Sequence, residues 1–339
     1  MIPCSTDHIF RMTDDTGMFQ HAIDGVPDPN EGYTTDDNAR ALIMASLLYE
    51  RERKPAYAAL LYRYAAFLCY AQNKNGTFRN FMGYNRDFLE EMGSEDCFGR
   101  CLWAICYTLS RESTPRAIRN MLQMQLARAI PHCQSLRFLR AGAYAAVALS
   151  FLGKGSPYQD ELCKLSTLLA DAYRSHQVES WQWFENEMTY CNFVLPRAMM
   201  RVARILNVAE WQEIGLESLG FLESKTTEHG HFHAIGCHGW LKKGGKPARY
   251  DEQPVEPCGG VLAYLTAYKM TGDASYLEKA RTCFSWYLGN NAQKVCMVDL
   301  DTGGCYDGTN GDQINRNQGA ESLVSYWIAY LKLQNYLSQ

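Results

Sequence analysis

The sequence lacks several features that would place it in other classes of protein. Its longest apolar stretch, residues 141–152, is much shorter than the roughly 20 residues that a membrane-spanning helix needs. The net charge at pH 7 is only −4, so no strongly basic surface is available to attract nucleic acid or anionic lipid. The first residues contain no apolar segment typical of a signal peptide. We therefore expect a soluble, cytoplasmic protein that binds neither nucleic acid nor membrane.

Paired cysteine motifs are also missing, although the chain has 13 cysteines. Their number is odd, their spacing is irregular, and no Cys-x-x-Cys motif occurs that could bind zinc or carry out redox chemistry. We expect reduced thiols, many of them buried as small apolar side chains. Hydrophobic residues make up 47% of the chain and no long polar tract occurs, so the composition is that of a folded globular protein.

Sustained period-two alternation is absent, which argues against a protein built on sheets. Apolar residues instead recur at helical spacing, in two kinds of segment that alternate along the chain. One kind is amphipathic and suits a helix with one solvated face, as near 55–71, 115–130, 158–175, 208–223 and 275–288. The other kind is apolar nearly all round and must be enclosed by other helices; these segments are 39–49, 101–109, 141–152, 193–206, 259–270 and 320–333.

This alternation predicts a closed ring of helical hairpins. Each buried helix except the last is followed by an amphipathic one, with a repeat of roughly 45 to 65 residues. An open α-solenoid is the alternative, but its repeats are usually shorter and more uniform. We therefore predict an all-α (α/α)6 toroid with inner and outer rings of helices, in which residues 1–339 form a single catalytic domain.

Acidic residues gather just before the predicted inner helices. If these helices run parallel in a toroid, their N-termini open at one end and the preceding residues converge there. Helix capping accounts for one acid per helix, but not for adjacent pairs mixed with aromatic and amide side chains. We call the residues just before each predicted inner helix its entrance. The third entrance carries no acid and contains Arg137 and Arg140 instead. The acids at the other five are Asp36, Asp37, Glu95, Asp96, Glu185, Glu187, Asp251, Glu252, Glu256 and Glu321.

Carboxylates crowded together at one end of the ring repel each other, so some of them should keep a proton near neutral pH. Glycoside hydrolysis needs this combination, because one carboxylic acid protonates the leaving oxygen while a carboxylate activates water or attacks. The catalytic candidates are Asp37, Glu95, Asp96 and Asp251. Among them, Asp96 or Glu95 is expected to act as the acid and Asp251 as the base. The leading reading is a glycoside hydrolase that acts on an oligosaccharide or polysaccharide.

Aromatic rings that stack on sugar faces and polar groups that bind hydroxyls would complete such a site. Arg40 and Arg100 are expected to pair with acids rather than to meet the substrate directly. Trp181, Trp183, Trp240 and Tyr250 are the stacking candidates. The other substrate-binding candidates are Tyr33, Asp36, Glu185, His238, Gln253, Glu256, Asn317, Gln318 and Glu321.

The segment 229–250 is glycine-rich and carries four of the eight histidines. The spacing of His229, His231 and His233 would place all three on one side of an extended chain, as metal ligands require. No Glu-x-x-His motif or cysteine pair accompanies them, and we expect no metal and no cofactor. A second reading is a sugar epimerase or isomerase in which His231, His233 and His238 act as acid and base. A third is a non-catalytic module that holds a glycan for a partner glycosyltransferase.

Several stretches carry a resemblance to a known type of protein: "GYTTDDNARAL", "GSEDCFGRCLWA", "YDEQPVE", "GGCYDG" and "NQGAESLVSYW". They resemble a bacterial module of the six-hairpin glycosidase superfamily, which occurs alone or attached to glycosyltransferase domains. The resemblance extends from Asp7 to Leu333 and implies an (α/α)6 toroid, carbohydrate chemistry and a glycosyltransferase as a partner, but no catalytic assignment. One departure is Cys191 in "TYCN", where the pattern leads us to expect the aspartate of "TYDN".

Overall fold

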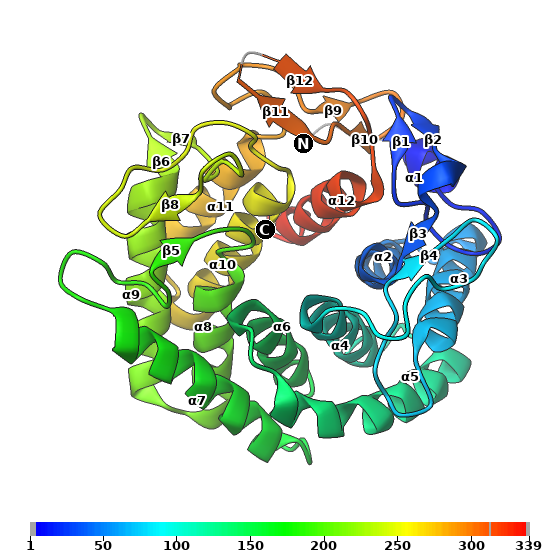
Figure 1. The fold of residues 1–339 in the computed structure, drawn as a ribbon, viewed down its shortest axis with the longest axis horizontal. Coiled ribbons are helices and arrows are strands. Elements are labelled where there is room, and N and C mark those ends of the chain that lie inside the picture. Colours follow the sequence, from blue (N-terminus) through cyan, green and yellow to red (C-terminus); the bar gives the residue numbers. More distant parts are fainter. Residues whose placement is uncertain (1–4, 312, 337–339) are drawn as a thin grey trace.

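The computed structural model describes residues 5–311 and 313–336, and it shows a closed ring of helices (Figure 1). Each inner helix packs against the next along the chain, and the last packs back against the first, which closes the ring. The inner helices are α2 (Thr35–Arg51), α4 (Glu95–Leu109), α6 (Leu139–Ser150), α8 (Val194–Leu206), α10 (Val255–Thr271) and α12 (Ala320–Gln334).

The outer helices surround this ring and follow the first five inner helices. They are α3 (Pro55–Ala71), α5 (Arg116–Ala129), α7 (Gln159–His176), α9 (Ala209–Thr226) and α11 (Ser275–Ser285). Outside α12, the described chain places the short helix α1 (Asp7–Arg11) and several two- and three-residue strands (Figure 1). The predicted (α/α)6 toroid is confirmed, and the open solenoid is wrong because the first and last inner helices are in contact.

Local sequence explains where the inner helices begin and how closely they pack. The Thr34 side chain accepts the N–H of Asp37 at the start of α2, and Ser94 does the same for Cys97 at the start of α4. Gly99 lies where α4 meets α6, and a Cβ atom there would come within 2.7 Å of the Ala141 carbonyl oxygen. Only glycine therefore permits this close approach of the two helices.

Short antiparallel strand pairs shape the connections between helices. Two of them flank helix entrances: β3 (Tyr33–Thr34) pairs with β4 (Phe81–Met82), and β5 (Glu187–Met188) pairs with β8 (Leu241–Lys242). Two 3-10 turns, η1 (Pro29–Glu31) and η2 (Ile130–Ser135), complete the connections. The remaining pairs are β1 (Ala22–Ile23) with β2 (Val26–Pro27), β6 (Thr227–Glu228) with β7 (His231–Phe232), β9 (Val298–Asp299) with β10 (Gly304–Cys305), and β11 (Gly308–Asn310) with β12 (Gln313–Asn315).

Two further expectations from the sequence concern thiols and membrane spans. The cysteines within residues 5–311 and 313–336 are all free thiols. In the same ranges, none of the helices combines the length and the apolar character that crossing a bilayer demands.

Candidate active site at the mouth of the ring

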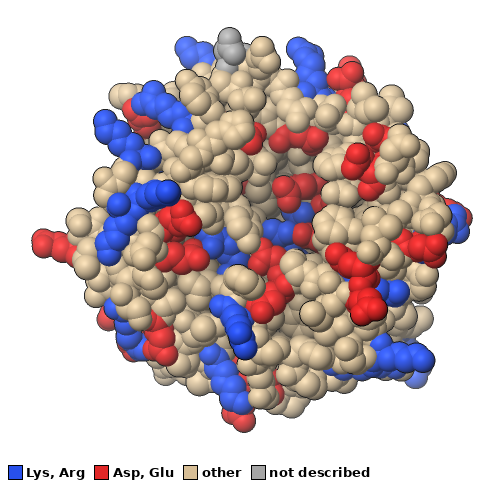
Figure 2. Space-filling model, in the orientation of Figure 1, with Lys and Arg blue, Asp and Glu red and all other residues tan. Residues whose placement is uncertain are grey.

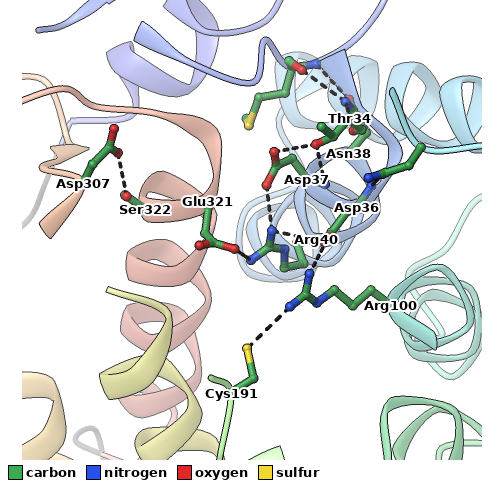
Figure 3. Close-up of polar contacts among 12 residues, drawn as sticks. Thr34, Asp36, Asp37, Asn38, Arg40, Arg100, Cys191, Asp307, Glu321 and Ser322 are labelled. Carbon is green, nitrogen blue, oxygen red and sulfur yellow. Dashed lines mark hydrogen bonds and ion pairs between the residues drawn. The ribbon is translucent and has the colours of Figure 1, made fainter. Parts of the chain in front are cut away.

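Ion pairs connect the first turns of three inner helices. Arg40 of α2 bonds the Glu321 carboxylate of α12 across 2.9 Å, and Arg100 of α4 pairs with Asp36 of α2 (Figure 3). Because these residues all lie within the first two turns of their helices, the N-termini of α12, α2 and α4 share one end of the ring.

The other three inner helices begin at the same end. Arg140 of α6 donates to the Asn192 side chain, 3.2 Å away, just before α8. The backbone N–H of Cys191 donates to the Glu256 carboxylate in the first turn of α10. Arg100 reaches across to the Cys191 sulfur at 3.5 Å and so connects the two halves of the ring. All six entrances therefore converge, and we call the hollow that they surround the mouth.

The mouth is lined mainly by acids, with arginines lower in the hollow. Figure 2 shows acidic side chains around the central hollow and basic ones deeper within it. Arg40 lies 2.7 Å from Asp37 and 3.0 Å from Asp36, and all three side chains are at least largely buried. Burial alone would raise the pKa of Asp36, but the charges of Arg100 and Arg40 outweigh it and hold that pKa below its usual range. Asp36 is therefore a fixed counter-charge for two arginines.

Two other carboxyls of the mouth hold a proton more strongly. Burial raises the pKa of Asp37 to about 6, against the opposing charge of Arg40 and with added repulsion from Asp36. Burial likewise raises the pKa of Glu256 to about 7, although the backbone N–H of Cys191 favours its ionised form. The mouth thus combines carboxylates that are ionised with carboxyls that stay partly protonated near neutral pH.

Asp251 is the most available of the predicted catalytic acids. It lies just before α10 and is only partly buried; within the described residues, no group forms a hydrogen bond or ion pair with its carboxylate. Its backbone has a φ of 64°, in the left-handed region that costs a residue with a Cβ about 1 kcal/mol or more. Strained, unpaired carboxylates of this kind cluster at functional sites.

Glu95 and Asp96 are neighbours with different surroundings. The Glu95 carboxylate accepts the backbone N–H groups of Arg137 and Phe138 at 2.8 and 3.0 Å, so it holds the two residues that precede α6. One oxygen of Glu95 is thus already bonded to two backbone N–H groups, and its expected role as general acid stays a prediction. Asp96 instead accepts the hydroxyl of Tyr190 at 2.7 Å.

The aromatic lining differs from the one predicted. Trp181 and Trp183 are 3% and 0% exposed, so the expected stacking role of both is corrected to core packing. Tyr190, which the sequence analysis missed, is 38% exposed, and its ring lies 6.5 Å from that of Trp240. Its position directly before Cys191 at the fourth entrance is the signal that could have identified it.

Three further candidates contact the N-terminal segment. The Tyr33 hydroxyl is buried and donates to Asp14 at 2.6 Å, so its expected role in substrate binding is corrected to a structural one. The Asn317 side chain accepts the backbone N–H of Asp24, and the backbone carbonyl of Gln318 bonds the His8 ring. The expected roles of Asn317 and Gln318 in substrate binding stay predictions.

The remaining candidates lie near the mouth or beside it. Glu185 forms an ion pair with Arg140 at 2.7 Å, and Gln253 is partly buried before α10. Tyr250 and His238 are exposed. Asp307, which was not predicted, accepts the N–H of Gly319 and the hydroxyl of Ser322 and so caps α12 (Figure 3).

A groove of about 1370 Å³ adjoins the fifth entrance. His233 and Glu252 line it, with 3.4 Å between the His233 Nδ1 and a Glu252 oxygen, and this carboxylate raises the pKa of His233. His231 is exposed outside the mouth cluster. In the part of the chain that the structure describes, no three His, Cys, Asp or Glu side chains are arranged to hold a metal ion.

Comparison with known proteins supports the fold. No family model and no curated protein matches the sequence. A cellobiose 2-epimerase from Bacillus thermoamylovorans has a similar structure, with 13% identity, a TM-score of 0.76, and coverage of 99% of this chain and 96% of its own. A D-mannose isomerase is 13% identical, with a TM-score of 0.74 and coverage of 97% of this chain and 94% of its own. A GH76 α-mannanase from Bacteroides thetaiotaomicron is 9% identical, with a TM-score of 0.64 and coverage of 90% of this chain and 87% of its own. The chain thus has an (α/α)6 fold like that of these structures.

Proposed function

We propose that this protein is a glycoside hydrolase whose active site is the mouth of the ring. The proposal rests on two carboxyl groups near the mouth that differ in pairing and in how strongly they hold a proton. Asp251 is unpaired and solvent-accessible, whereas burial holds the pKa of Glu256 at about 7. Such a contrast separates a general acid from a base or nucleophile.

The roles follow from these surroundings. Asp251 acts as base or nucleophile, because its carboxylate has no competing partner within the described residues. Glu256 supplies the proton to the leaving oxygen, since it is still half protonated near pH 7. Asp96 is the second candidate for the acid, at 2.7 Å from the Tyr190 hydroxyl. Asp37 positions Arg40 and Thr34, which occupy both of its oxygens.

The charges of the mouth favour a neutral sugar. Arg40 pairs with three carboxylates, Arg100 with Asp36, and Arg140 with Glu185, so each guanidinium already has an acidic partner. No arginine of this set is available to neutralise a uronic acid. Tyr190 and Trp240 offer ring faces on which an uncharged pyranose stacks.

Carbohydrate chemistry also agrees with the neighbours in structure, because an epimerase of cellobiose, an isomerase of mannose and a mannanase all act on sugars. The proposed partnership with a glycosyltransferase rests on the sequence resemblance alone.

The test is reducing-end release by the purified protein from neutral α- and β-linked oligosaccharides, together with the variants Asp251→Asn, Glu256→Gln and Asp96→Asn. Turnover that Asp251→Asn and Glu256→Gln abolish supports both roles, and formation of a glycosyl azide with inverted anomeric configuration when azide is added to Asp251→Asn would identify a nucleophile. Asp171→Asn is the matched control, because this side chain is exposed on the outer helix α7 and pairs with Arg174 of the same helix. Sugar binding by calorimetry with no turnover would instead identify a non-catalytic module.

An epimerase or isomerase is the second candidate, because His233 is paired with Glu252 at a large groove. This function predicts no new reducing ends and exchange of a carbon-bound sugar proton with solvent. NMR of the sugar in D2O would detect that exchange, and His233→Asn should remove it. Deuterium incorporation without hydrolysis would overturn the hydrolase.

A further inference from the structure

Arg197 of α8 is a buried cation without a counter-charge. Its side chain is 5% exposed, and no carboxylate, carbonyl or hydroxyl of the described residues accepts a hydrogen bond from its guanidinium. The guanidinium carbon lies over the ring of Trp103, 5.2 Å from its centroid. This sets it apart from Arg40 and Arg100 of the mouth, which both have acidic partners.

The isolation of Arg197 is energetically unfavourable. Burial lowers its pKa to about 10, but an arginine remains charged at neutral pH. A buried charge without partners is strongly destabilising, and a cation–π contact offsets only part of that cost. A group from solution that accepts hydrogen bonds would offset this cost.

A cavity of about 30 Å³ lies next to Arg197 on the axis of the ring, beneath the mouth. A water needs about 10 to 15 Å³ of such space, so the cavity holds a monatomic ion or one to two waters but no large oxyanion. The Trp103 Nε1 is a second buried donor without an acceptor. No acidic residue lines the cavity, whose walls include Arg40, Trp103, Tyr144, Cys191, Val194 and Arg197.

Other cations near the axis increase the positive potential. Arg201, one turn further along α8, bonds the Ser150 hydroxyl at 2.7 Å and lies over the Phe151 ring. Lys332 of α12 donates to the Tyr107 hydroxyl at 2.8 Å. Neither forms an ion pair with an acid among the described residues. An anion would relieve this excess charge, whereas a neutral water would not.

We propose that the cavity beneath the mouth binds one chloride-sized monatomic anion, held by the Arg197 guanidinium and the Trp103 indole N–H. The anion is a structural component that permits a buried arginine at the floor of the mouth. It is independent of the reaction that the mouth carries out.

Thermal unfolding in sodium chloride or sodium bromide, compared with sodium gluconate at constant ionic strength, tests the proposal. At a chloride concentration 100 times its Kd, we expect Tm to rise by about 4 °C for a chain of this length. Arg197→Met should lose this dependence on chloride. It should also be at least as stable as the unmodified protein in gluconate, because it removes an unpaired buried charge.

Arg204→Gln is the matched control, since Arg204 is exposed on the same helix and should leave the chloride effect unchanged. Crystals soaked in bromide should show anomalous density in the cavity, which tests the site even if Arg197→Met does not fold. Equal Tm values in chloride and gluconate, an equal rise with sulfate, or an empty cavity after the bromide soak would each overturn the proposal.

Discussion

The two ends of the inner ring differ in how their charges are paired. At the mouth, Arg40, Arg100 and Arg140 each contact a carboxylate. At the opposite end Arg111 lies 3.7 Å from Glu50, but Arg201 and Lys332 contact hydroxyls and aromatic rings instead of acids. The acids of the mouth and the cations of the opposite end are both placed as the helix dipole favours, because it stabilises acids at N-termini and cations at C-termini. The sign of a charge at a helix end therefore does not indicate function. The pairing and burial of the side chain and the strain of its backbone are the features that do.

The largest effect is expected at the unpaired acid of the mouth. Under the proposed function, Asp251→Asn should reduce kcat by about 10²- to 10⁴-fold, because it removes the proposed base or nucleophile while leaving the shape of the site unchanged. Initial rates and sugar affinity by calorimetry would separate the two effects. A variant that loses affinity but keeps its kcat would show that Asp251 binds substrate rather than reacting.

Breaking a pair in the mouth should strongly destabilise the protein. Arg40→Met would leave Asp36, Asp37 and Glu321 without their shared cation, and it should lower the free energy of unfolding by about 3 to 5 kcal/mol. Denaturant titration measures this change. A loss below 1 kcal/mol would mean that the cluster is well solvated rather than mutually dependent.

The protonated carboxyls of the mouth should make stability depend on pH. Glu256 has an ordinary pKa of 4.5 and one of about 7 when folded, so the folded state binds its proton more tightly. Its contribution to stability is present below pH 4.5 and is lost as pH rises through 7, and Asp37 acts in the same direction between 3.8 and about 6.

We therefore expect Tm to fall between pH 5 and pH 8, and Glu256→Gln to reduce that fall. Scanning calorimetry of both proteins across this range measures the difference. Parallel pH profiles for the two would contradict the raised pKa of Glu256.

The smallest effect is expected at the far end. Lys332→Met removes a cation that has no acidic partner in the described chain. Burial lowers the pKa of Lys332, and the charges of Arg111, Arg197 and Arg201 lower it further. The free energy of unfolding should stay within about 1 kcal/mol or rise. If Lys332→Met lowered the free energy of unfolding as much as Arg40→Met, the two ends of the ring would not differ in how strongly their charges depend on partners.

Much of the fold was predictable because helix periodicity is local. The spacing of apolar residues located the inner helices at 39–49 and 320–333, and the structure has them at Thr35–Arg51 and Ala320–Gln334. The convergence of acids at one end followed from parallel inner helices. Individual roles did not follow: Trp181 and Trp183 share the entrance sequence of Tyr190, yet only Tyr190 is exposed.

The sequence by itself determined the repeat, the ring and the clustering of acids, since these depend on residue spacing and on the dipole of each helix. Tertiary structure alone decided which acid bonds the backbone before a neighbouring helix, as Glu95 does, and which is left unpaired, as Asp251 is within the described residues. It also decided that Arg197 is buried without a carboxylate while Arg40 contacts three. The reason is that pairing and desolvation depend on distances between elements far apart in the chain, which local patterns do not contain.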